Sequence, residues 1–235
     1  MADMPLPKNQ GLRLERFEYR LVYEKTGRAR YISHLDLLRT FQRAFKRARI
    51  PLWYTQGFNP HAYLMFPLAL PLGTDSRVEI LDVALIEELS FDELRDRMNS
   101  SMPEGLKIVS AAKPVMKHTE IASAEYNVRL RSLTLPPEEV CARFNAFLSQ
   151  EKIEVEKRTK KKGINLVDIK PHITLLCSTA EEGVAVLQLR LPAGSEFNLN
   201  TGVVVDAFTA YLGSGFDAVY TTRTKILTKQ GENFI

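Results

Sequence analysis

The alternation of apolar and polar residues marks the first element of the chain. Residues 16–23, RFEYRLVY, alternate over eight positions and are rich in aromatic side chains, which predicts a half-buried β-strand. After a turn the apolar period lengthens to that of a helix, and Ser33 stands before it as a suitable N-cap. We therefore expect a helix over residues 34–49, ended by Pro51.

At 100° per residue this helix has two different sides. The apolar side carries Leu37, Leu38, Phe41, Ala44, Phe45 and Ala48, and the opposite side carries Arg39, Arg43, Lys46 and Arg47. His34 falls near the apolar side, in the first turn. The helix is thus predicted to pack on a sheet and to present a basic stripe to solvent.

The rest of the first half supplies three more strands and one helix. Residues 62–72 are apolar but contain two prolines, which favours an edge strand or an interrupted strand. A strand is predicted over residues 78–86, a helix capped by Ser90 over 91–100, and a strand over 106–111. The order β-α-β-β-α-β is that of a ferredoxin-like domain.

The second half repeats this order. Strands are predicted over residues 126–132, 184–191 and 220–227, helices over 138–149 and 203–212, and two arms over 152–158 and 167–177 around a basic turn. The fold class is therefore α+β, with two tandem ferredoxin-like (βαββαβ) halves and antiparallel sheets.

The same pattern divides the chain into five parts. We expect a flexible N-terminus at 1–14, a first ferredoxin-like domain at 15–115, a linker at 116–124, a second such domain at 125–229 and a tail at 230–235. The linker is placed where Pro114 and Lys117-His118-Thr119 interrupt any periodicity.

Composition is that of an ordinary globular protein. The chain has 235 residues, of which 45% are hydrophobic and 26% charged, enough to bury a core without disulfides. No apolar run approaches about 20 residues and no signal peptide is present, so we expect no membrane contact and a cytoplasmic location. Cys141 and Cys177 have no metal-ligand or redox spacing.

The positive charge is concentrated at the start of the chain. Residues 8–61 hold 12 Lys/Arg and 4 Asp/Glu, whereas residues 62–120 hold 6 and 10. Such asymmetry favours an anionic partner on one face. The candidate nucleic-acid-binding residues are Arg30, Arg39, Arg43, Lys46, Arg47, Lys157, Arg158, Lys160, Lys161 and Lys162. The plainer alternative is a solvated helix face and a solvated hairpin tip.

The segment after the first helix, YTQGFNPH, places polar side chains in a turn between apolar segments. Tyr54, Gln56, Asn59 and His61 are candidates for specificity or for docking a partner. Tyr54 could also stack on a base, as aromatic side chains do in single-strand binders, whereas Trp53 is expected to pack in the core.

Catalysis has only weak candidates. His34, Tyr54 and His61 are the acid–base groups near the basic residues, and cleavage of RNA needs two such groups within reach of one phosphate. The chain contains no P-loop, GxGxxG, GxSxG or HExxH motif and no metal-binding spacing of acidic residues. We therefore expect no metal and no cofactor.

The motifs SHLDLLR at 33–39, QGFNPH at 56–61 and FPLALPLG at 66–73, with DIKP at 168–171, resemble those of the radical-SAM-linked proteins. That bacterial family, a domain of unknown function, is fused to a radical-SAM protein or encoded beside one, and this chain resembles the stand-alone form. The resemblance implies a radical-SAM partner, and the family's gene neighbourhoods imply a link to RNA or translation. The tandem layout also resembles the CRISPR repeat-processing endoribonucleases in fold order alone.

Three functions follow as hypotheses. The first is an accessory RNA-binding module, without activity of its own, that acts with a radical-SAM enzyme in RNA modification or ribosome and RNA metabolism. The second is a metal-independent ribonuclease or RNA-modifying enzyme. The third is a scaffold that docks on a radical-SAM partner without touching RNA. The sequence leaves the oligomeric state open.

Overall fold

The computed structural model describes residues 15–56, 58–158, 164–195 and 197–235. Its strands are β1 (Phe17–Lys25), β2 (Leu64–Met65), β3 (Asp75–Leu85), β4 (Leu106–Ala112), β5 (Ile121–Arg131), β6 (Glu154–Arg158), β7 (Ile164–Asp168), β8 (Thr174–Glu181), β9 (Val184–Pro192) and β10 (Ala218–Thr228). Its α-helices are α1 (His34–Arg47), α2 (Phe91–Asn99), α3 (Pro137–Leu148) and α4 (Thr201–Leu212).

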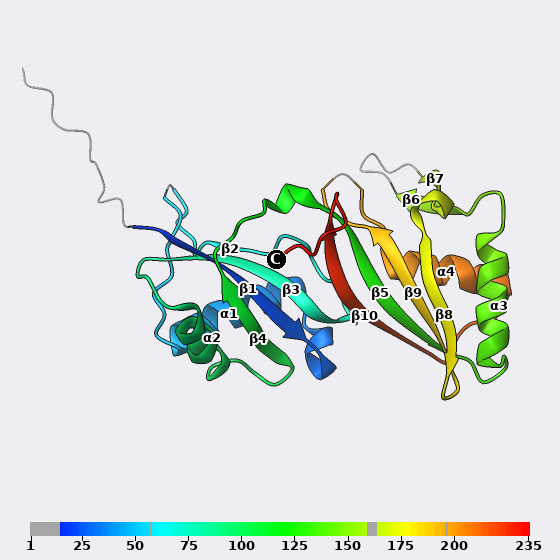
Figure 1. The fold of residues 1–235 in the computed structure, drawn as a ribbon, viewed down its shortest axis with the longest axis horizontal. Helices are drawn as coiled ribbons and strands as arrows, with labels where there is room; N and C mark the ends of the chain where they lie inside the picture. Colours follow the sequence, from blue (N-terminus) through cyan, green and yellow to red (C-terminus); the bar gives the residue numbers. More distant parts are fainter. Residues whose placement is uncertain (1–14, 57, 159–163, 196) are drawn as a thin grey trace, which may run out of the picture.

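One eight-stranded sheet runs through the whole molecule (Figure 1). The strand order is β4-β1-β3-β10-β5-β9-β8, and β2 pairs with β3 beside this path. All pairings are antiparallel except the short contact between β3 and β10. The protein is therefore a mixed α/β fold with a mainly antiparallel sheet and, in the described part of the chain, four α-helices.

Each half buries one set of alternating strand residues beneath two helices. In the first half, Tyr19, Leu21 and Tyr23 of β1 pack with Phe41 of α1 and Leu94 of α2. These strand positions are two apart, so their side chains share one face of the sheet. The sequence pattern of β1 thus fixes which face the helices cover.

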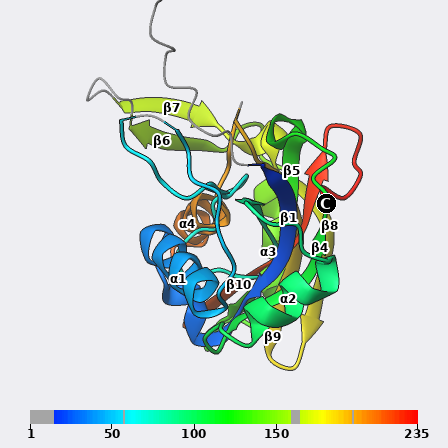
Figure 2. The ribbon, with the colours of Figure 1, turned by 90° about the vertical axis from the view of Figure 1, so that its left-hand side faces the viewer.

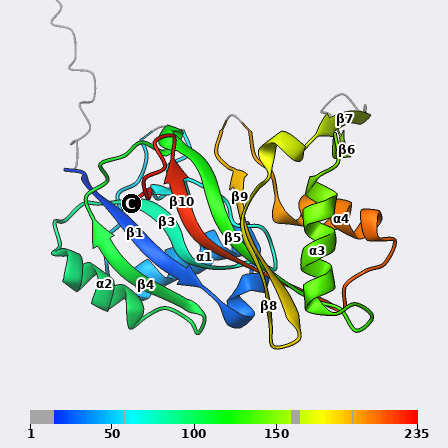
Figure 3. The ribbon, with the colours of Figure 1, turned by 45° about the vertical axis from the view of Figure 1, so that its right-hand side comes forward.

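In the second half, α3 and α4 pack together over β5 and β9 (Figure 3). Phe144 and Phe147 of α3 contact Phe208 of α4 at ring-centroid distances of 4.9 and 5.4 Å. The burial of these three large aromatic side chains contributes much of the stability of this core, because hydrophobic stabilisation scales with the apolar area removed from water.

Buried polar contacts join the two halves. Arg223 of β10 donates to both carboxylate oxygens of Glu79 in β3, at 2.9 and 3.1 Å, and each side chain is 1% exposed. Arg223 also donates to the carbonyl of Ala69 at 3.0 Å, and Leu68 beside it enters the second core. The FPLALPLG motif is therefore folded into the junction.

Several boundaries differ from the sequence predictions. Only Leu64–Met65 of the predicted strand 62–72 pairs with a neighbour, since the prolines on either side of Leu68 cannot donate to a ladder. β5 begins at Ile121, inside the predicted linker. The predicted tail is packed, because Phe234 is buried beneath the guanidinium of Arg20 at 4.3 Å. The predicted N-terminal segment, 1–14, lies outside the described residues.

The predicted arm over residues 167–177 is two separate strands. β7 pairs only with β6, in a two-stranded ribbon that stands apart from the main sheet (Figure 2), whereas β8 joins the edge of that sheet. Asp168 separates them, since its Oδ1 accepts from the backbone N–H groups of Ile153 and Lys170 at 2.9 and 3.0 Å. The carboxylate therefore fixes the base of the ribbon through backbone groups.

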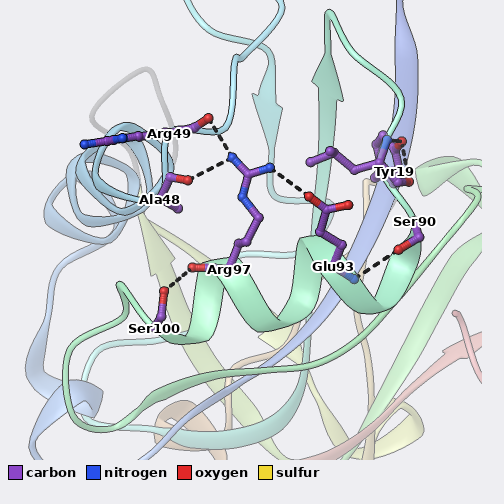
Figure 4. Close-up of polar contacts among 8 residues, drawn as sticks. Tyr19, Ala48, Arg49, Ser90, Glu93, Arg97 and Ser100 are labelled. Atoms are coloured by element: carbon purple, nitrogen blue, oxygen red, sulfur yellow. Dashed lines mark hydrogen bonds and ion pairs between the residues drawn. The ribbon is translucent and has the colours of Figure 1, made fainter.

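Helix α2 holds the C-terminal end of α1 in place (Figure 4). Arg97 of α2 donates to the carbonyls of Ala48 and Arg49 at 3.0 and 2.8 Å, and it pairs with Glu93 at 3.1 Å. A cation is favourable at a helix C-terminus, where carbonyls lack intrahelical partners. The chain that leaves α1 is thereby positioned for the site described next.

Candidate functional site

A cavity of about 790 Å³ lies between α1 and the segment that follows it. Its helical wall is the polar face of α1, where Arg39, Gln42, Arg43 and Lys46 lie at positions three or four apart. Residues at this spacing are neighbours on a helix surface. The predicted basic stripe thus forms one side of a hollow; we call this hollow the α1 groove.

The opposite wall is the polar turn. Tyr54, Pro60 and His61 line it, and the apolar side chains of Ile50, Leu52 and Ala62 line the rest. Tyr54 pairs with Ala62 through an antiparallel bridge, and the N–H of Thr55 donates to the carbonyl of His61 at 2.8 Å. The turn is therefore a small hairpin whose backbone holds Tyr54 and His61 over the groove.

The positive charge in the groove is only partly neutralised. Arg39 pairs with Asp36 at 3.1 Å on the helix surface. The hydrogen bond from Ser33, and then that from Arg39, lower the pKa of the Asp36 carboxyl. Arg43 and Lys46 have no ion-pair partner within the part of the chain that the structure describes. Two cations therefore face the groove without an ion-pair partner among those residues, although the charge of Arg43 still acts on the Asp36 carboxyl.

His61 is held in one orientation. Its Nδ1 lies 3.1 Å from the carbonyl oxygen of Asn59 and 3.0 Å from Thr55 Oγ1. A carbonyl oxygen can only accept, so Nδ1 carries the proton and donates to it. In the neutral form of the ring this leaves Nε2 as the acceptor, and no described residue bonds to that atom.

Several predicted site residues lie elsewhere. Arg30 pairs with Asp75 at 3.1 Å, and its guanidinium lies 5.2 Å from the ring of Tyr31. Arg47 donates to the carbonyl of Ser101 at 2.6 Å, on the side of α1 that faces the loop after α2. Both are therefore engaged in contacts outside the α1 groove.

Two of the predicted polar residues of the turn do not line the groove. Gln56 and Asn59 are exposed. Asn59 acts through its backbone, since its carbonyl fixes the His61 ring. Trp53 does not line the groove and packs edge-on to Tyr63. The Arg16 guanidinium lies 4.7 Å from the centre of the Trp53 ring.

The candidate acid–base groups are divided. Tyr54 and His61 lie in the groove, whereas His34, though exposed, packs edge-on to Phe66 at 5.2 Å, at the other end of α1. The α1 groove is lined by His61 and not by His34. The groove therefore offers one histidine and one phenol.

The second basic cluster is only partly described. Lys160, Lys161 and Lys162 lie outside the described residues, and for Lys157 and Arg158 only the backbone of β6 is described. The β6–β7 ribbon and the segment that carries the turn rise on the same side of the molecule, toward opposite ends of its long axis (Figures 1 and 2).

The groove contains residues that the sequence did not single out. Gln42 lies on the helix between Arg39 and Lys46, and its i+3 spacing from Arg39 could have identified it. Ile50 and Leu52 gave no signal, because their place under the turn depends on where the chain folds back after α1.

The described residues form neither a metal site nor a membrane-spanning helix. Among them, no group of three or more His, Cys, Asp and Glu side chains is arranged to hold a metal ion. None of the described helices combines the length and apolarity that a membrane crossing requires.

Comparison with known proteins gives a family but no activity. No curated protein matches the chain. A solved structure of an unknown protein from Galdieria sulphuraria is similar over 89% of this chain and 98% of its own, at 13% identity and a TM-score of 0.25, which supports no inference. A family model described as an uncharacterized protein conserved in bacteria matches residues 18–201. The chain therefore belongs to this bacterial family, DUF2344.

Proposed function

We propose that the protein is an RNA-binding module whose binding surface is the α1 groove. The observation that carries the proposal is the arrangement of the groove: Arg43 and Lys46, which have no ion-pair partner in the described part of the chain, face an exposed aromatic ring and a histidine across the cavity. Cations that bind phosphates release condensed counterions, and this favourable release makes the affinity fall as the salt concentration rises. Aromatic rings and oriented acceptors are the groups that contact bases.

The architecture is consistent with this proposal. In each half the fourth strand lies beside the first, followed by the third and the second, as in β4-β1-β3-β2 and β10-β5-β9-β8. We infer from this order that both halves are ferredoxin-like units at 15–115 and 125–229, fused side by side through β3 and β10. Each unit then has a helix-covered face, and the groove lies on the outer side of the first unit's helix α1.

The partner is part of the same proposal. The resemblance of the sequence motifs to those of the radical-SAM-linked proteins supports a bacterial radical-SAM enzyme that acts on the bound RNA. The groove contains one oriented histidine, His61, and lacks the second, His34. General acid–base cleavage needs two groups at one phosphate, so an accessory role fits this arrangement better than an intrinsic ribonuclease.

A filter-binding titration against tRNA, at salt concentrations from 50 to 200 mM as in standard practice, tests the proposal. We expect Arg43→Ala combined with Lys46→Ala to weaken binding and to lower the slope of log affinity against log salt by about 1.4, from about 0.7 per single-strand phosphate contact. The matched control is Lys107→Ala combined with Lys113→Ala, which removes the same charge from exposed residues outside the groove.

The control separates a local contact from the effect of net charge. If both double variants weaken binding equally, the groove is not the binding surface. If neither changes binding, and a radical-SAM partner co-purifies after nuclease treatment, the protein is a docking scaffold and the RNA proposal fails. New cleavage products or modified nucleosides from the pure protein would instead favour the enzyme alternative.

A further inference from the structure

We infer that the α1 groove takes a single unpaired nucleotide, with the base stacked on Tyr54 and the phosphate on Arg43 and Lys46. The inference rests on the proposed RNA binding and names the form of RNA that binds. Its first support is size. The α1 groove is an open hollow of about 790 Å³, which gives room for one small ligand, since small-ligand sites measure about 300–1,000 Å³, whereas a duplex is recognised across a long, shallow surface.

The second support is the chemistry of the two walls. The cations stand together on the helix, while Ile50, Leu52 and Ala62 form an apolar lining beneath the turn. Apolar side chains cannot hydrogen-bond to a phosphate, but they tolerate the face of a base. A ligand that matches both walls is charged on one side and flat and aromatic on the other, as a nucleotide is.

The third support is Tyr54 itself. Tyr54 is 56% exposed, although its backbone is fixed by the bridge to Ala62. The adjacent Trp53 is instead covered by Tyr63 and by Arg16. An aromatic side chain that stands on a fixed backbone and is left open beside cations is suited to stack on a base.

The fourth support is the supply of polar groups at the edge of the cavity. His61 presents Nε2 as an acceptor, since Nδ1 donates to Asn59, and Gln42 brings an amide that both donates and accepts. Only an unpaired base exposes its Watson–Crick edge to such groups. In a duplex that edge is occupied by the opposite strand.

Fluorescence anisotropy tests the inference on the full chain. The probes are a fluorescein-labelled 12-nucleotide RNA of mixed sequence and the same RNA annealed to its complement, at equal salt. We expect the single strand to bind at least about tenfold more tightly. Tyr54→Ala should lower the single-strand affinity on the order of tenfold, while Tyr54→Phe keeps it, because stacking needs the ring and not the hydroxyl.

A spectroscopic readout separates stacking from a structural role. We expect 2-aminopurine in the single strand to be quenched on binding to the wild type and to Tyr54→Phe, but not to Tyr54→Ala at saturating protein. Tyr211→Ala serves as the control, because that tyrosine is similarly exposed, 44%, but lies on α4 in the other half. It should leave both affinity and quenching unchanged.

Failure of the inference and failure of the proposed function look different. The unpaired-nucleotide inference is wrong if duplex and single strand bind equally, or if Tyr54→Ala binds and quenches like the wild type. RNA binding still stands in either case, provided that the Arg43 and Lys46 double variant weakens it. If that double variant weakens binding to neither RNA, the proposed function is itself wrong.

Discussion

Two groups of ionised side chains inside the sheet have close partners of opposite charge. Arg20 of β1 makes two hydrogen bonds of 2.7 Å with Asp82 of β3, and both are buried. Glu125 of β5 accepts from Arg190 at 2.7 Å and pairs with Lys225 at 2.9 Å. Burying a charge is costly unless it is paired, so such residues should be sensitive to the loss of a partner or of their own charge.

Glu125 gives a prediction about pH. Burial alone would raise the pKa of its carboxyl, but hydrogen bonds from Arg190 and Lys225 outweigh burial, and the pKa is lowered. The carboxylate therefore stabilises the folded state above the ordinary carboxyl pKa of about 4.3, and this contribution is lost as the pH falls through the folded-state pKa. We expect Glu125→Gln to lower the free energy of unfolding by about 1.5–3 kcal/mol at pH 7.

The measurement is urea denaturation of both proteins between pH 7 and pH 3, and the difference should shrink toward zero below about pH 4. Glu181→Gln is the control, since Glu181 meets Arg129 at 3.5 Å with both side chains about half exposed, and it should change stability by less than about 1 kcal/mol. A difference for Glu125→Gln that is constant with pH would contradict the assignment.

Among the elements, those set by local signals could be predicted from the sequence. The predicted caps are confirmed, because Ser33 and Ser90 accept from the N–H groups of Asp36 and Glu93, each at 3.2 Å. The helices α1 and α2 accordingly begin where predicted. Strand 62–72 could not be predicted correctly, since a strand exists only where another strand is within pairing distance, and that distance depends on the whole fold.

The turn before β4 gives a prediction about backbone packing. Gly105 has a φ of +83°, and a Cβ there would lie 2.5 Å from the carbonyl oxygen of Thr26. Gly183, in the turn between β8 and β9, has a φ of +78° but no atom within 4 Å of a Cβ. We expect Gly183→Ala to cost about 1 kcal/mol of stability for the left-handed conformation, and Gly105→Ala to cost a further 1–3 kcal/mol or so for overpacking.

Thermal and urea unfolding of the two variants measure this difference, and Gly183→Ala is the matched control for the shared positive φ. Equal losses for both would mean that the Thr26 loop moves aside without cost. The hydrogen bond from Thr26 N–H to the Gly105 carbonyl, 2.8 Å, argues that it does not.

At the scale of the whole molecule, the sequence identified many residues of the groove, but it did not show how the chain brings its two walls together. The stripe on α1 and the turn were found from helical period and turn chemistry, and Arg39, Arg43, Lys46, Tyr54 and His61 do meet. Arg30 and Arg47 were grouped with them by charge alone, yet each has a different neighbour. Charge identifies candidates, but only the path of the backbone decides which side chains share a surface.

The continuity of the sheet could not be foreseen, because it depends on contacts between residues far apart in the chain. Glu79 and Arg223 are separated by 144 positions, and neither stands out in the sequence. Burial would lower the pKa of Arg223, but the nearby Glu79 and Tyr126 keep it raised. The two halves are thus joined by a charge pair that each half alone would leave unpaired.

Because the Glu79–Arg223 pair joins the two halves, we expect them to unfold together. Trp53, the single tryptophan, lies in the first half, so its fluorescence follows that half, while far-UV circular dichroism follows both. We expect the two signals to give one urea midpoint. Arg223→Met, in the second half, should shift the Trp53 midpoint by the equivalent of about 3–5 kcal/mol, since it leaves Glu79 buried without a partner.

Arg129→Met is the matched control, because Arg129 lies on β5 of the same half but its side chain is 43% exposed and its ion pair is long. It should leave the midpoint within about 1 kcal/mol of the wild type. Two separate midpoints, or a Trp53 transition that Arg223→Met does not move, would mean that the halves are independent domains that merely touch. Coincident shifts would mean that the α1 groove depends for its stability on strands more than a hundred residues away.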